Sequence, residues 1–296
     1  MTTPSPSPKP AREPRERAYK AGARMARDRI AREAPLDAAA LEQVEAADLL
    51  VVSGVYDHVE RVLDALETPY TRLGPGQIAS VALQPEQLLV VNCPGQIDRD
   101  SVGRIREFVS AGGSLFTTDW ALRFVVQPAF PGTIEHTGRV THDDVVPIEI
   151  FDHDNPFLAG VMDGQDEPQW WLEGSSYPIT VVDQDRVRVL IASRRLERRY
   201  GEAPVAVLFP WGEGEVFHMI SHYYLQRTEL RNARHRAGAS GYFTEKGMPV
   251  PADLEADLDG LALGEVEAAA GSSRLMANVI ADKKRRAMHG KEGERR

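Results

Sequence analysis

The sequence of 296 residues contains a single cysteine, Cys93. This excludes an internal disulfide framework and every metal site built from several cysteines, and it fits a reducing compartment. No apolar run reaches the roughly 18 residues that a membrane-spanning helix needs, and the first residues lack the apolar centre of a secretory signal. We therefore expect a cytoplasmic protein with no membrane partner.

Lysine is absent from residues 35–234, which carry 16 arginines against 30 acidic residues. Both ends are basic, with nine Lys and Arg against four acids in residues 1–34 and eight against three in residues 268–296. An acidic body opposes binding to a phosphate backbone, so we expect no nucleic-acid partner. The basic ends favour a protein partner instead.

The clearest structural signal lies in residues 88–122. An apolar run ends at Cys93-Pro94-Gly95, an amphipathic helical pattern covers 98–110, and a second apolar run ends at Asp119. This is the pattern of two parallel strands joined by a crossover helix. In such sheets ligands and catalytic groups gather at the carboxyl ends of the strands, which here are residues 92–95 and 117–120.

The rest of the chain favours the α/β class. Further strands are predicted at 49–55, 70–73, 145–151, 177–183 and 187–192, with a hairpin at 205–220, and helices at 57–66 and 222–234. We predict a three-layer sandwich with a mainly parallel central sheet in residues 35–234. Residues 1–34 are expected to be a disordered and basic helical tail, and residues 235–296 a flexible tail ending in an amphipathic helix at 272–288.

The order of several short motifs resembles a known superfamily. The motifs are VNCPG at 91–95, GGSLFTTD at 112–119, DHDNPFLAG at 152–160 and EVFHMISHYY at 215–224. Over residues 48–226 the chain is similar to the class I glutamine amidotransferase-like superfamily, which has a flavodoxin-like fold, and to its ThuA-like branch. The resemblance implies a nucleophile elbow at the end of the second motif.

The departures from that superfamily concern its catalytic residues. Glutamine hydrolysis needs a thiolate at the elbow, a histidine to activate it and a glutamate to orient that histidine. In this register the elbow holds Asp119, the histidine is His222, and Tyr224 stands in the glutamate position. Cys93 follows the neighbouring strand, where the superfamily uses backbone to hold an oxyanion. The resemblance therefore implies a degenerate triad and no glutaminase activity.

Two hypotheses remain for Asp119 and His222. As neighbours at the carboxyl ends of strands, they form a candidate acid and base pair. Alternatively, Asp119 caps the helix that begins at Trp120, and His222 bonds to backbone. We expect the surrounding ligand crevice to be lined by Asn92, Cys93, Gly95, Thr118, Trp120 and Tyr224.

Metal ligands of the right type occur at 142–144 (HDD) and 152–154 (DHD), but their spacing matches no defined motif. His218 and His222 are four residues apart, yet 215–220 is a predicted strand, which opposes a helical metal motif. We therefore expect solvated turns and no metal or cofactor. The arginine-rich run at 194–199 is either an anion contact or a solvated loop.

The first functional hypothesis is a non-catalytic pseudoenzyme, a ligand-binding or protein-assembly module that contacts partners through its tails. The alternative is a hydrolase of a sugar or related small metabolite that uses Asp119 and His222 as acid and base. The module can act through its crevice, its tails or both, so a small-molecule ligand is a further candidate partner.

Overall fold

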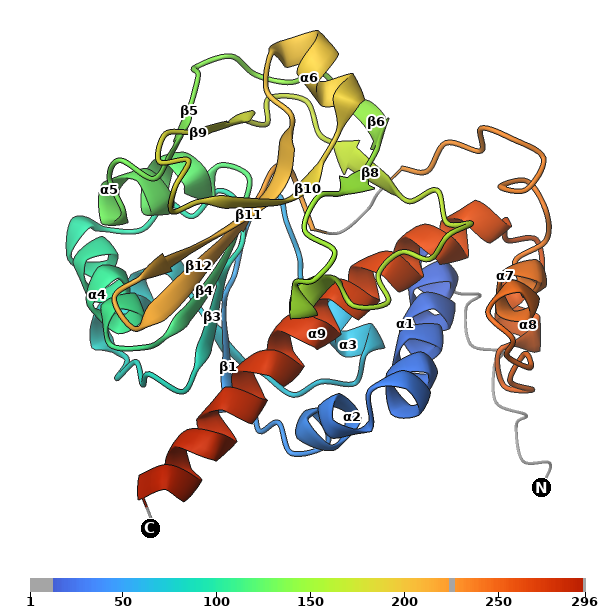
Figure 1. The fold of residues 1–296 in the computed structure, drawn as a ribbon, viewed down its shortest axis with the longest axis horizontal. Helices are drawn as coiled ribbons and strands as arrows, with labels where there is room; N and C mark the ends of the chain where they lie inside the picture. The colour runs from blue at the N-terminus through green and yellow to red at the C-terminus, as the bar shows by residue number, and fades with distance from the viewer. Residues whose placement is uncertain (1–12, 224–226, 295–296) are drawn as a thin grey trace, which may run out of the picture.

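The computed structural model describes residues 13–223 and 227–294. Its centre is an eight-stranded sheet in the order β2-β1-β3-β4-β12-β11-β10-β7 (Figure 1). Four of the seven pairings, those from β2 to β12, are parallel, and the other three are antiparallel. The strands are β1 Leu49–Val52, β2 Thr71–Leu73, β3 Leu88–Val91, β4 Ser114–Thr118, β7 Glu149–Ile150, β10 Arg188–Ala192, β11 Pro204–Trp211 and β12 Gly214–Met219. The predicted α/β class with a mainly parallel sheet is confirmed.

The central strands β1, β3 and β4 are buried at every residue. This is why they read as unbroken apolar runs in the sequence instead of alternating patterns. Helix α4 (Arg99–Ser110) connects β3 to β4, and its first turn is capped by Asp98, whose carboxylate accepts from the Ser101 N–H at 2.8 Å. Figure 1 shows α4 on one side of the sheet and helices α1 (Pro14–Glu33), α3 (Glu60–Ala65) and α9 (Leu263–Glu294) on the other.

Helices α1 and α9 are the largest difference from the sequence prediction. They lie along each other and against the α/β domain, with Ala21, Ala23 and Met25 of α1 fully buried (Figure 1). A Cβ added to Gly22 would lie 2.5 Å from the Ala270 backbone nitrogen, so the backbones of the two helices are in direct contact at this point. Residues 235–294, which the sequence assigns to a flexible tail, contain three helices, and the longest of them, α9, packs against α1. The closest approach is that of Gly22 to Ala269 and Ala270, small residues to which a search for large apolar side chains gives little weight.

Smaller elements complete the structure. The predicted strand at 145–151 is split in two, because its second half, β7, joins the main sheet while its first half, β6, pairs with β8. The predicted helix at 222–234 is absent from the described part of that segment. The remaining elements are α2 Pro35–Leu41, α5 Gln127–Ala129, α6 Arg194–Tyr200, α7 Ser240–Glu245, α8 Glu255–Leu258, η1 Pro75–Ser80, η2 Leu122–Val126, η3 Pro156–Leu158, β5 Ile134–His136, β6 Asp144–Pro147, β8 Gln169–Leu172 and β9 Ile179–Val181.

Within residues 13–223 and 227–294, none of the helices has the length and apolar character required to span a bilayer.

Candidate active site

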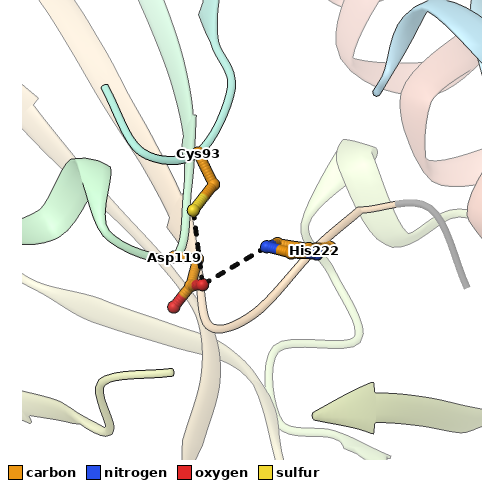
Figure 2. Close-up of side chains that lie close together, drawn as sticks. All are labelled: Cys93, Asp119 and His222. Carbon is orange, nitrogen blue, oxygen red and sulfur yellow. Dashed lines mark hydrogen bonds and ion pairs between the residues drawn. The ribbon is translucent and has the colours of Figure 1, made fainter. Parts of the chain in front are cut away.

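Three neighbouring parallel strands end at one point of the sheet edge. Cys93 follows β3, Asp119 follows β4 and His222 follows β12, and their side chains converge (Figure 2). The Asp119 Oδ2 atom lies 3.5 Å from the Cys93 Sγ and 3.4 Å from the His222 Nε2. All three residues are buried, with exposed fractions of 1 to 3 %. The sequence placed each of them at this edge, and the structure brings them into contact.

Asp119 has an unusual backbone conformation. Its φ angle is 48°, in the left-handed region that non-glycine residues seldom adopt, and its N–H donates to the Met219 carbonyl at 3.0 Å. This is a sharp turn directly after a strand, the local geometry of a nucleophile elbow. Because the turn is anchored to the neighbouring strand end, the carboxylate is held above the sheet edge.

The alternative role of Asp119 as a helix cap does not fit these contacts. The Leu122 N–H bonds to the backbone oxygen of Asp119 at 2.9 Å, not to its side chain. The carboxylate instead faces Cys93 and His222, and its Oδ1 atom is buried with no hydrogen-bond partner among the described residues. A buried carboxylate oxygen without a donor is costly, so it indicates a function other than capping.

His222 lies between two carboxylates. Its Nδ1 is 2.8 Å from the Glu173 Oε2, on the side opposite Asp119, although neither ring nitrogen forms a well-aligned hydrogen bond within the described structure. Burial lowers the pKa of His222, but the contact with Asp119 and the negative charges of Asp57, Asp119 and Glu173 outweigh it, so the net pKa is raised. The imidazole therefore sits in a field that favours a positive charge.

Glu173 is the member of the site that the sequence did not indicate. It follows β8, in the small two-stranded sheet, and its backbone N–H donates to the Ser221 Oγ at 2.8 Å. Burial raises the pKa of its carboxyl, an effect that the nearby His222 opposes and the charges of Asp119 and Asp57 reinforce. With 37 % of its side chain exposed, Glu173 connects the buried cluster to solvent. No local motif marks a residue that reaches the site from another sheet.

Cys93 is held at its backbone by the next strand. Its N–H donates to the Thr118 Oγ1 at 3.1 Å, and its carbonyl accepts from the Val55 N–H at 3.0 Å. Burial, and then the negative charge of Asp119, raise the pKa of the Cys93 thiol. In the protein as described, the thiol is a protonated donor toward Asp119 and not a ready nucleophile.

Two residues predicted to line a crevice support the turns instead. Asn92 is buried, and its amide donates to the Val52 carbonyl and to Glu60 at 3.2 and 3.0 Å. Gly95 has a φ of 66°, and a Cβ there would lie 2.8 Å from the Ala121 Cβ. Both residues therefore hold the β3 end in place beneath the elbow.

The other residues predicted to line the crevice have different positions and contacts. Thr118 is buried and acts as the acceptor for Cys93. Trp120 is half-buried, donates through Nε1 to the Ser175 carbonyl at 2.7 Å, and lies against Tyr56 and Tyr177 with ring centroids 6.3 and 5.9 Å away. Trp120, the residue after Asp119, thus belongs to an aromatic group with Tyr56 and Tyr177. Tyr224 lies outside the described residues.

The other candidate metal groups are engaged or exposed. Asp144 pairs with Arg195 at 2.7 Å and with Arg199, so the arginine-rich run forms internal ion pairs. His142, His153 and Asp154 are exposed. Among the described residues, the one group of three metal-ligating side chains within 4.8 Å of one another is Cys93, Asp119 and His222.

Comparisons with known proteins give distant likenesses in structure. No protein-family model matches the sequence, and no curated protein matches it. Solved structures include a cytoplasmic protein from Salmonella typhimurium (TM-score 0.43, 10 % identity, covering 60 % of this chain and 88 % of that one). A protein from Thermoplasma acidophilum, described as a subunit of a GMP synthase, has a TM-score of 0.43 and 12 % sequence identity, and the match covers 61 % of this chain and 86 % of that one. A protein from Bacteroides uniformis, described as ThuA-like, has a TM-score of 0.40 and 11 % sequence identity, and the match covers 60 % of this chain and 82 % of that one. Scores this low carry no statement about activity.

Proposed function

We propose that this chain is a hydrolase whose reacting centre is formed by Asp119, His222 and Glu173. The observation that carries the proposal is the position of His222 between two carboxylates, 3.4 Å from Asp119 and 2.8 Å from Glu173. Nucleophile, base and orienting acid follow one another in this order in hydrolytic triads on unrelated folds. The three-layer, glutamine amidotransferase-like architecture and its degenerate triad are part of this proposal.

Each residue has a distinct task in such a reaction. Asp119 stands at the elbow with a free Oδ1, so it is the group that meets the substrate, as a nucleophile or as a proton acceptor. His222 exchanges a proton with water or with the leaving group through Nε2. Glu173 fixes the orientation of the ring through Nδ1. Because no thiolate stands at the elbow, the usual amidotransferase reaction is not expected.

The substrate class is proposed from the aromatic group formed by Trp120, Tyr56 and Tyr177. Trp120 is half-buried and the neighbouring Tyr56 is 51 % exposed, which gives flat apolar surfaces beside polar catalytic groups. Small-molecule sites combine these two features. A sugar or a related small metabolite presents both an apolar ring face and hydroxyl groups, and is therefore the substrate class that we propose.

The experiment is a turnover screen on the full-length protein with chromogenic glycosides, sugar esters and lactones. On any substrate that is found, Asp119→Asn and His222→Asn are expected to lower kcat by about 10² to 10⁴, the usual contribution of a positioned acid or base. Asp154→Asn, which changes an exposed carboxylate in the same way, is the matched control and should keep full rate. Full turnover in Asp119→Asn would refute the proposal.

A ligand-binding or assembly module without turnover is the second candidate function. Its support is the burial of Cys93, Asp119 and His222, which leaves little of the cluster open to a substrate. Assembly through the tails is less well supported, because the buried faces of α1 and α9 are already used against each other. A ligand that raises the Tm but is never turned over by the wild-type protein would favour the module.

A further inference from the structure

We infer that Cys93, Asp119 and His222 bind a zinc ion, with Glu173 supporting His222 from outside. This inference rests on the proposed function for its catalytic meaning, since it names the cofactor of the same centre. The binding itself is argued from geometry, charge and ligand chemistry.

The distances match a tetrahedral zinc site. Zinc bonds of about 2.3 Å to sulfur and about 2.0 to 2.1 Å to oxygen and nitrogen place the ligands of a tetrahedron about 3.5 Å (S to O) and about 3.3 Å (N to O) apart. The observed separations from the Asp119 Oδ2 are 3.5 Å to Cys93 Sγ and 3.4 Å to His222 Nε2. Two of the three ligand pairs therefore already have the spacing that a shared ion requires, and all three ligand atoms lie within 4.8 Å of one another (Figure 2).

Hydrogen bonding accounts poorly for the contact between His222 and Asp119. A separation of 3.4 Å is beyond the usual range for an imidazole donor and a carboxylate. In the described structure, Asp119 Oδ1 and the Nε2 of His222, the ring nitrogen that faces Asp119, are buried without a hydrogen-bond partner that meets ordinary geometry. Buried polar atoms rarely remain unpaired, and a bound ion is one of the standard reasons when they do.

The surroundings supply the support that metal ligands normally have. A metal-bound histidine directs its second ring nitrogen at a carboxylate, and Glu173 Oε2 lies 2.8 Å from the Nδ1 of His222. The backbone next to His222 is fixed as well, because the Tyr223 N–H donates to Asp57 at 3.0 Å. Cys93 is anchored in the same way through Thr118.

The charge balance also favours a cation. Asp119 and Glu173 make ion pairs with His222 and, as far as the described residues go, with no lysine or arginine. Metal binding removes the proton from the thiol, so Cys93 would add a further negative charge. A divalent ion offsets these charges where one imidazolium cannot.

The ligand types select zinc over the lighter cations. A thiolate and an imidazole are soft and borderline ligands that suit zinc, whereas magnesium and calcium prefer oxygen throughout. Three protein ligands leave the fourth tetrahedral position for water, the arrangement of catalytic zinc sites. With zinc bound, Asp119 and the Nε2 of His222 would be ligands, in place of the nucleophile and proton-transfer roles proposed above, and a water in the fourth position would supply the nucleophile. The sequence prediction of no metal is replaced by this proposal, since it considered local spacing alone.

The test measures metal binding by the purified full-length protein after metal removal by dialysis against a chelator. We expect one zinc ion per chain by calorimetric titration and native mass spectrometry. Cobalt replacement should give the charge-transfer absorption of a thiolate ligand. Cys93→Ser, Asp119→Asn and His222→Asn should weaken zinc binding by more than about 100-fold, and Glu173→Gln by about 10- to 100-fold, as for other outer-shell carboxylates. Cys93→Ser should also abolish the cobalt-thiolate absorption.

His153→Asn and Asp154→Asn change the same side-chain types at exposed positions, and they should bind zinc like the wild type. Where a site variant fails to fold, the wild-type protein alone decides, because stoichiometric zinc should raise its Tm. Wild-type protein without stoichiometric zinc, or undiminished binding in folded Cys93→Ser and His222→Asn variants, overturns the inference. Zinc binding without any turnover would leave the inference in place and count against the hydrolase alone. Turnover that chelators do not affect, in a protein that binds no zinc, would support the hydrolase and overturn the zinc inference.

Discussion

His218 makes the stability of this protein sensitive to mild acid. It lies on β12, is fully buried, and has its Nδ1 2.8 Å from the Thr117 Oγ1, while its Nε2 has no partner among the described residues. Burial lowers its pKa from 6.5 to about 3. Protonation would place a positive charge in the core, where no carboxylate of the described residues forms an ion pair with it, so the folded state keeps the ring neutral.

The sign and size follow from that difference in pKa. The unfolded chain binds the proton below pH 6.5 and the folded chain only near pH 3, so the full stability is present above pH 6.5 and is lost as the pH falls toward 3. At pH 4.5, two units below the unfolded pKa, the loss is about 3 kcal/mol at 1.36 kcal/mol per unit. This is a large part of the typical total of about 5 to 15 kcal/mol.

The assay is urea unfolding of the wild type and of His218→Phe at pH 7.5, 6.5, 5.5 and 4.5. The phenyl ring is similar in size to imidazole and cannot be protonated. Between pH 7.5 and 4.5, His218→Phe should therefore lose about 3 kcal/mol less of its free energy of unfolding than the wild type does. Contributions from His222 and from the carboxyl groups are common to both proteins and cancel in the difference. His153→Asn, at an exposed site, should follow the wild type. Curves for wild type and His218→Phe that run parallel within about 0.5 kcal/mol would refute the reasoning.

Three further predictions concern packing and ion pairs, all measured as the free energy of unfolding. Gly22→Ala should lower the free energy of unfolding by about 1 to 3 kcal/mol, because the added Cβ meets the α9 backbone. Gly103→Ala, which places a Cβ in open space on α4, should raise it by about 0.5 to 1 kcal/mol. Equal effects of the two substitutions would contradict the close α1–α9 approach. Asp144→Asn should cost about 1 to 3 kcal/mol, since this buried carboxylate holds two arginines of α6. Lys283→Met should cost a similar amount of about 1 to 3 kcal/mol by leaving the Gly112 carbonyl without its 2.7 Å donor, and an unchanged value would show that water replaces it.

The parts of the fold that the sequence predicted are those dominated by large apolar side chains. The strands β1, β3 and β4 are buried on both faces, so each is a continuous apolar run that pattern alone identifies. The α1–α9 pairing was missed because its closest contact joins Gly22 to Ala269 and Ala270, whose contribution depends on close approach and not on size. Such an approach is a tertiary property that no local pattern expresses.

The residues of the candidate site also fall into those that local patterns could place and those that depend on tertiary packing. Cys93, Asp119 and His222 could be placed together because each follows a parallel strand, and parallel strands end at a common edge. Glu173 could not, because it arrives from a separate small sheet whose position is fixed only by tertiary packing. Asn92 and Gly95 share the right strand end, but their contacts beneath the elbow depend on neighbours that the sequence does not identify.

The pairing of the first helix with the last sets an order of events during synthesis. Contacts such as Arg274 with Glu33 join residues 241 positions apart, so α1 leaves the ribosome long before its partner exists. Its alanine face must wait, uncovered or in a temporary association, until α9 has been translated. Long-range contacts of this kind slow folding. A nascent chain stalled before residue 263 should therefore present α1 to chaperones, and completion of α9 should end that exposure.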